Sequence, residues 1–223
     1  MLIDYLTERF FFSDAGFFIS AAGYLLAPAL ALFLHRLGQF QKKKKAVPEC
    51  GPLTSFLLRQ LSGDLWKILF FFVTGCLYPT YRIGNHETNP SAKRKIFGGG
   101  LFTTLTAAIL SFLLYTAFEL ALSVFGGLTW EILLFAAKAS TCANLSLLWF
   151  TVLPLPGSEA ETLLRKKPFS KRGIAFRENG TLPFFLYCIL GLFLACAGLP
   201  QANGQICSLS GMLTLFPVLL IGG

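Results

Sequence analysis

Long apolar runs, separated by shorter polar segments rich in lysine and arginine, dominate the chain. Five of these runs come close to, or exceed, the roughly 20 residues that a helix needs to cross a hydrocarbon core about 30 Å thick. They cover residues 15–34, 96–118, 132–153, 182–199 and 206–222, and only Lys138 places a charge inside one of them. The pattern therefore predicts an all-α integral membrane protein with about five transmembrane helices.

One further apolar segment, residues 68–78, is too short to cross a bilayer by itself. We interpret it as a re-entrant or tucked element, which is tolerated at membrane depth only where protein surrounds its backbone. Because polar segments between the runs are short, residues 1–223 are predicted to form a single polytopic membrane domain.

Composition excludes an ordinary water-soluble domain. Hydrophobic residues make up 54% of the chain, charged residues only 13%, and the mean hydropathy is +0.63. The net charge of +8 is compatible with a nucleic-acid partner, but the basic residues flank the apolar runs, as membrane topology alone requires. We therefore expect the lipid bilayer as a partner and no nucleic acid.

The distribution of lysine and arginine predicts the orientation in the membrane, since short loops rich in them stay cytoplasmic. If segment 68–78 returns to the side from which it came, one face receives all of the 19 lysines and arginines except Arg9 and Lys138. This places the amino terminus outside and the basic loops in the cytoplasm. Small size and the lack of eukaryotic targeting features favour a bacterial inner membrane.

Three segments beside the runs carry residues that are unusual at a membrane. The first is LAPALALFLHRLG at 26–38, the second is NPSAKRKIFGGGLFT at 89–103, and the third is FTVLPLPGSEA at 150–160. Considered singly, they are typical of a helix kink, of close helix packing at glycines, and of a helix stop at prolines.

Taken in order, the three segments resemble the site-2 protease family of intramembrane zinc metalloproteases. Members of that family carry HExxHxxxAxxxG, then an NP-basic-AGPxxN segment, then FNLLPxPxLDG. FTVLPLPGSEA matches the last of these without a gap and places Glu159 at the family's metal-binding aspartate. The resemblance covers about residues 15–165 and implies a site-2-protease-like core.

The same resemblance implies that catalysis is lost. With Gly38 aligned to the glycine of the first motif, HExxH falls on the apolar stretch 26–30, so both histidine ligands and the general-base glutamate are missing. Zinc hydrolysis needs about three protein ligands and a base for the bound water. We therefore predict no catalytic residue, no cofactor, and Glu159 as the one residue left at a metal-binding position. His35 is expected at the membrane edge and not as a ligand.

By resemblance, such an inactive relative retains the ability to hold a membrane-protein client without cleaving it. Its client groove would include segment 68–78 and the following residues: Gly98, Gly99, Gly100, Thr103, Pro154 and Pro156.

Two alternatives stay open. A small transporter or channel subunit is suggested by Lys138 inside a span, by the short segment 68–78 and by the glycine-rich entry to a span. An active metalloprotease would instead bind zinc through ligands that the motifs do not reveal.

Overall fold

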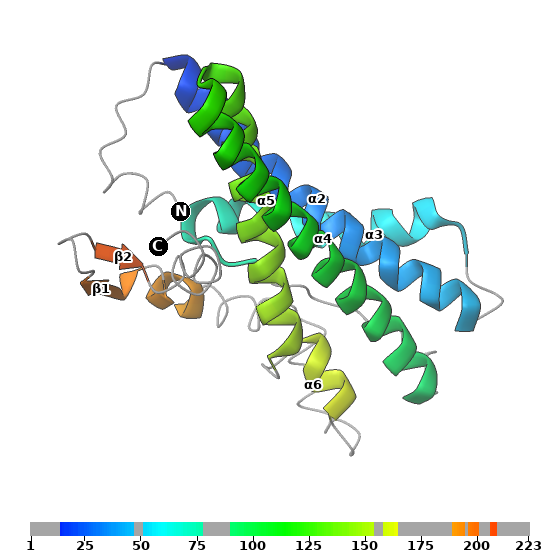
Figure 1. Ribbon diagram of the computed structural model, residues 1–223. Coiled ribbons are helices and arrows are strands. Elements are labelled where there is room, and N and C mark those ends of the chain that lie inside the picture. The colour runs from blue at the N-terminus through cyan, green and yellow to red at the C-terminus, as the bar shows by residue number, and fades with distance from the viewer. Residues whose placement is uncertain are drawn as a thin grey trace.

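The computed structural model describes residues 14–46, 51–77, 90–153, 158–164, 189–194, 196–200 and 206–208. The fold of these residues is helical apart from one short ribbon (Figure 1). Its elements are α2 (Asp14–Ala46), α3 (Leu53–Thr74), α4 (Pro90–Phe125), α5 (Leu128–Val152), α6 (Glu159–Leu164), β1 (Gly198–Pro200) and β2 (Ile206–Ser208).

Helices α4 and α5 form a hairpin. Pro90 starts α4, where its fixed φ suits the first turn and its missing N–H costs nothing. The turn after Phe125 places Gly126 at φ 64° and Gly127 at φ 99°, values that side chains with a Cβ rarely adopt. At its other end α5 stops at Val152, two residues before Pro154, as the prolines predict.

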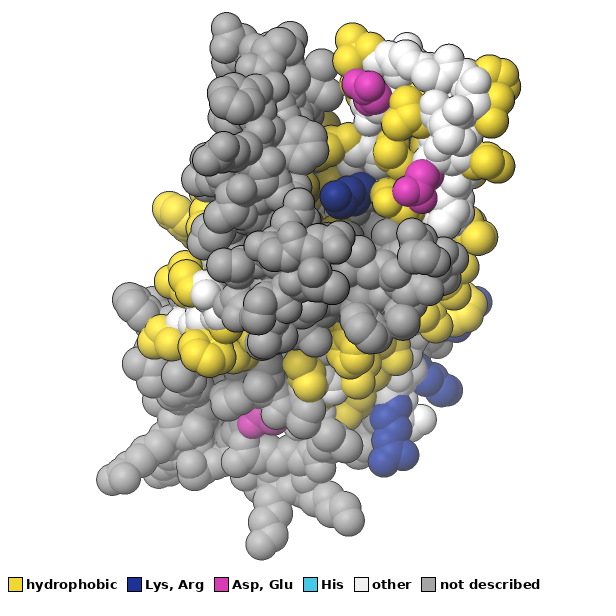
Figure 2. Space-filling view, turned by 60° about the vertical axis from the view of Figure 1, so that its left-hand side comes forward, with side chains coloured by type: hydrophobic (Ala, Val, Ile, Leu, Met, Phe, Trp, Pro, Cys, Tyr) yellow, Lys and Arg dark blue, Asp and Glu magenta, His cyan; other side chains and the backbone are white. Residues whose placement is uncertain are grey.

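Two helices of the described part, Ser91–Phe125 and Leu128–Val152, are long and apolar enough to cross a membrane. The first contains the predicted span 96–118, and the second covers the predicted span 132–153 except for its last residue. Only 11% of the apolar window of the first helix is buried, against 44% for the second, so α4 presents most of its apolar surface outward. Figure 2 shows hydrophobic side chains over much of the described surface in view.

Helix α2 runs well beyond the predicted span 15–34 and ends at Ala46. Its buried residues recur every three or four positions from Tyr24 through Ala31 and His35 to Gln39, which makes one continuous face. Apolar side chains of this face pack with α3 and α5 in the core, whereas from His35 to Gln39 the face buries polar side chains. The last turns, after Gln39, carry the lysines and are not buried.

Segment 68–78 is tucked into the core as the end of α3 (its last residue lies outside the described part). The helix stops at Gly75, whose left-handed φ of 73° lets its N–H donate to the Phe71 carbonyl at 2.7 Å. Phe71 and Leu77 are fully buried, and the Leu77 N–H donates to the Ser146 hydroxyl of α5 at 2.7 Å. These contacts fix the end of α3 against α2 and α5.

The prediction of helix at 198–199 and 206–208 is wrong. Strands β1 and β2 pair there antiparallel, with Leu199 opposite Cys207. Pro200 has no N–H to continue a helix, so the chain turns back as a ribbon. Residues 189–194 are helical, as expected, but 182–188 and 209–222 of the last two predicted spans lie outside the described residues.

Candidate functional site

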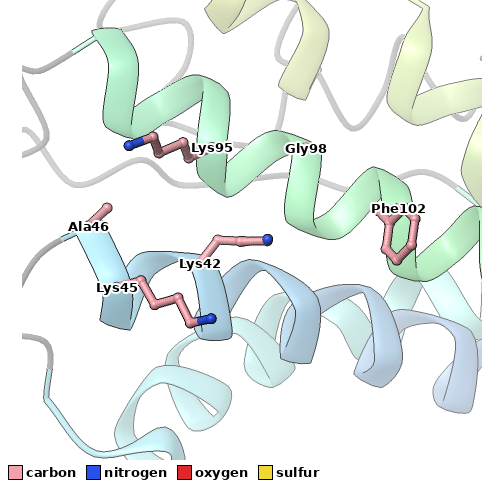
Figure 3. Close-up of a pocket in the computed structure, with 6 residues that line it drawn as sticks. All are labelled: Lys42, Lys45, Ala46, Lys95, Gly98 and Phe102. Carbon is pink, nitrogen blue, oxygen red and sulfur yellow. The ribbon is translucent and has the colours of Figure 1, made fainter.

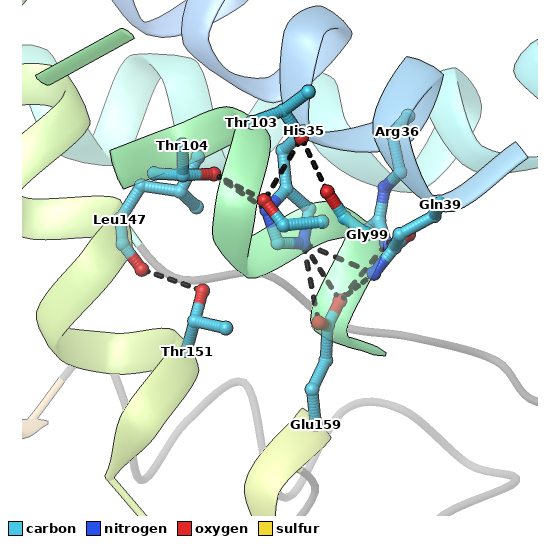
Figure 4. A network of polar contacts seen from close by, with 10 residues as sticks. His35, Arg36, Gln39, Gly99, Thr103, Thr104, Leu147, Thr151 and Glu159 are labelled. Atoms are coloured by element: carbon cyan, nitrogen blue, oxygen red, sulfur yellow. Dashed lines mark hydrogen bonds and ion pairs between the residues drawn. The ribbon is translucent and has the colours of Figure 1, made fainter. Parts of the chain in front are cut away.

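Five polar side chains from three helices meet in the interior, and we call them the polar cluster (Figure 4). Each of the five is at most 2% exposed. They are His35, Arg36 and Gln39 of α2, Thr104 of α4 and Glu159 of α6.

The carboxylate of Glu159 is the centre of the polar cluster. Both of its oxygens lie 3.1 Å from Nε2 of His35. Its Oε1 also accepts from Gln39 Nε2 at 2.8 Å and from Arg36 Nη1 at 3.2 Å. Since Arg36 Nη1 donates in addition to Gln39 Oε1 at 3.0 Å, the amide bridges the guanidinium and the carboxylate.

Thr104 fixes the ring of His35 from the opposite side. Its hydroxyl donates to the Gly100 carbonyl at 3.0 Å, so its oxygen is free to accept from Nδ1–H of His35 at 2.8 Å. Nε2 of the ring lies 3.0 Å from the Gln39 amide nitrogen and faces the Glu159 carboxylate. Contacts at both ring nitrogens therefore fix the orientation of the ring.

Helical spacing and small residues explain how α2 delivers these groups. His35 and Gln39 are four residues apart and therefore lie on one face of the helix. Gly38, between them, contacts Thr103 so closely that any Cβ would overlap its side chain. A Cβ on Gly100 would lie 2.8 Å from both His35 Cε1 and Gln39 Cγ. Glycines at these positions thus let α2 and α4 approach each other.

Helix α6 presents Glu159 to the polar cluster from below in Figure 4. The Ser158 hydroxyl accepts from the Glu161 backbone N–H at 3.1 Å and caps the start of this short helix. Glu159 is the first residue after that cap, so the capped turn fixes where its side chain leaves the backbone.

The pKa of the Glu159 carboxyl results from opposing effects. Burial raises it, but the charge and hydrogen bond of His35, the charge of Arg36 and the hydrogen bond of Gln39 outweigh burial and lower it from 4.5 to about 2. Glu159 is therefore an anion at neutral pH, held among donors in the interior.

The predicted site residues fall into different environments. Glu159 lies in the polar cluster, Gly99, Gly100 and Thr103 pack toward α2, and Gly98 faces open space. Pro154 and Pro156 lie outside the described residues. His35, expected at the membrane edge, is fully buried among the helices and contacts Glu159.

Sequence reasoning missed the segment that faces Glu159. In the stretch 26–30, Leu26 is 68% and Leu30 54% exposed, so that stretch contributes nothing to the polar cluster. The segment that does contribute is HRLGQ at 35–39. Its histidine, arginine and glutamine all contact the Glu159 carboxylate. The signal that could have found it is the His-x-x-x-Gln spacing, which puts two polar side chains on one face of a helix.

The residues of the polar cluster do not fit zinc. Only His35 and Glu159 are ordinary zinc ligands, whereas a zinc site uses three or four. Across the described ranges, no three His, Cys, Asp or Glu side chains group closely enough to hold a metal. Moreover, the guanidinium of Arg36 already donates to the carboxylate, and its fixed positive charge opposes a divalent cation.

Chemically, the polar cluster stabilises an anion and holds a ring in place; the Thr104 hydroxyl beside that ring is fully buried and donates to the Gly100 carbonyl. Comparisons with known proteins add no relative: no protein-family model, curated protein or solved structure matches the chain.

Proposed function

We propose that the chain is a non-catalytic relative of the site-2 intramembrane proteases that holds a membrane-embedded client without cleaving it. The observation that carries the proposal is the ion pair of Arg36 and Glu159, with 3.2 Å between Nη1 and Oε1. If HRLGQ at 35–39 is set against HExxH, Arg36 stands at the general-base glutamate and Glu159 at a metal ligand. A built-in cation then balances the carboxylate, and the position of the general base carries a guanidinium, which cannot accept a proton from water.

The helices support a membrane setting for this function. Helix α4 exposes large apolar side chains along most of its length, which suits contact with lipid or with a transmembrane client. Lys42 to Lys45 end α2, and Lys93 to Lys95 begin α4, whereas Glu119 and Glu131 flank the α4–α5 turn. Such separation of charge supports an orientation with the basic ends in the cytoplasm.

The described interior favours a scaffold over a transporter. Its buried hydroxyls donate to carbonyls of their own helices, as Thr104, Ser111, Thr141 and Thr151 do, so they need no polar pathway beside them. Within the described ranges, Lys138 forms no ion pair with Glu119 or Glu131. A lone charge without a buried partner is weak support for a substrate path.

A photoreactive residue on the outward face of α4 tests the proposal. Leu113 is 56% exposed, and Ala108 of the same helix is 3% exposed and serves as the matched control. In native membranes, we expect the probe at Leu113, and not at Ala108, to crosslink one membrane-protein segment of unbroken mass. If the probe at Leu113 formed adducts with lipid alone, the proposal that a client binds there would be refuted. If the crosslinked client were cut within the bound segment, the proposal that the chain is non-catalytic would be refuted.

A further inference from the structure

A cavity of about 570 Å³ lies where the end of α2 meets the start of α4, and we call it the lysine pocket (Figure 3). Its volume falls within the range of ligand sites, roughly 300 to 1,000 Å³. The residues that line it are Lys42, Lys45, Ala46, Lys95, Gly98 and Phe102.

The charge of the lysine pocket is of one sign. Three of its lining residues are lysines and none is acidic. Lys42 and Lys45 are three residues apart on α2 and share a face, while Lys95 lines the pocket from α4, with its side chain running the opposite way to that of Lys42 (Figure 3). No carboxylate in the described parts of the chain forms an ion pair with any of them. Three ammonium groups that repel one another favour an anion, and lysine commonly binds the phosphate group.

The far wall of the lysine pocket is apolar and leads onto α4. Phe102 is 68% exposed, and Leu105, Ile109 and Leu113 continue the exposed face at helical spacing. From Phe102 to Leu113 this stripe is about 16 Å long at 1.5 Å per residue. One leaflet of a bilayer core is about 15 Å deep, so the stripe matches the length of an acyl chain.

Gly98 keeps the lysine pocket open. A Cβ at this position would meet nothing within 4 Å, whereas one on the neighbouring Gly99 would overlap the Lys42 side chain and α2. Gly99 therefore serves helix packing, and Gly98 borders free space. A large side chain at 98 fills the pocket without disturbing the contact between the helices.

We propose that the lysine pocket binds the phosphate of an anionic phospholipid whose acyl chain lies along the stripe from Phe102 to Leu113. The lysines recognise the headgroup, and the apolar stripe distinguishes a lipid from a free phosphate ion. The lipid proposal does not rest on the client proposal, although the two surfaces share Gly98 and Leu113 of α4.

Binding of phosphatidylglycerol to the detergent-purified full chain, followed by native mass spectrometry, tests the site. Lys45→Gln/Lys95→Gln removes one lysine from each wall of the pocket. Lys44→Gln/Arg94→Gln is the matched control, since it removes the same charge from adjacent residues that do not line the cavity. We expect the pocket pair to weaken binding about 30-fold and the control pair less than about threefold. Equal losses would overturn the site in favour of diffuse surface charge.

Two further measurements test whether the lipid fills the space beside Gly98 and whether the site distinguishes a lipid from a free phosphate ion. Gly98→Phe should weaken binding by at least about tenfold while Gly98→Ala leaves it unchanged; equal binding by both variants would overturn the placement of the lipid. Excess inorganic phosphate should fail to displace phosphatidylglycerol, and phosphatidylcholine should bind weakly. If inorganic phosphate displaced phosphatidylglycerol, the pocket would be a site for free anions, and the proposal that it binds a phospholipid would be refuted.

Discussion

Both carboxylate oxygens of Glu159 lie 3.1 Å from Nε2 of His35, although 124 residues separate the two in the sequence. This contact joins α6 to α2 at a point where α4 also meets them through Thr104. Three helices thus depend on one buried polar arrangement. Its disruption is expected to affect the stability of the chain and not a reaction.

Loss of the Glu159 charge should destabilise the fold. In Glu159→Gln, the buried guanidinium of Arg36 keeps its charge but loses the carboxylate, which costs about 3 kcal/mol of unfolding free energy. Denaturant unfolding in detergent measures this loss. The control is Glu161→Gln on the same helix, for which we expect a change within about 0.5 kcal/mol. Similar losses in both variants would contradict a special role for Glu159.

The contribution of Glu159 to stability should depend on pH. Its carboxyl pKa is about 2 in the folded chain against an ordinary 4.5, so the folded state binds the proton less tightly than the unfolded state. The stabilisation is then complete above about pH 4.5 and is lost as the pH falls toward 2. Unfolding free energies of wild type and Glu159→Gln should therefore converge on acidification. A difference that stays constant over this window would refute the assignment.

Close approach of α2 and α4 should make Gly38 intolerant of a side chain. A Cβ there would overlap Thr103 and crowd the Gly99 carbonyl, so Gly38→Ala is expected to lower the unfolding free energy by about 1–3 kcal/mol. Gly98→Ala is the control, because its Cβ meets nothing within 4 Å. The control should be neutral or stabilising by about 0.5–1 kcal/mol, as expected for alanine inside a helix. An equally tolerated Gly38→Ala would contradict the packing.

Hydrophobic pattern predicted α4 and α5 well, because a long uncharged run admits few structures besides a helix. It failed at the end of α2, where His35, Arg36 and Gln39 look like a polar loop unless their partners are known. The hydrophobic pattern also failed near Pro200. The apolar run before this proline predicted a helix, although 198–200 form a strand. Whether a polar residue is buried depends on how the helices pack, and the periodicity of one segment does not show this.

Glu159 shows which part of a site the sequence reveals. It became a candidate because FTVLPLPGSEA resembles a site-2 protease motif and places Glu159 at a metal-binding position. Its partners were not predicted, because they lie 120 to 124 residues away and one sequence does not show which distant segment packs against it. Only packing across Gly38 and Gly100 shows that HRLGQ, and not the apolar stretch 26–30, faces the carboxylate.

Zinc content of purified protein tests most directly whether a built-in cation has replaced a metal. Mass spectrometry should compare wild type with Arg36→Glu/Gln39→His, which removes the guanidinium and adds a carboxylate and an imidazole beside His35 and Glu159. We predict no stoichiometric zinc in wild type and about one zinc per chain in the variant. Zinc near one per wild-type chain, lost in Glu159→Ala, would contradict the proposal, and so would a folded double variant that binds none.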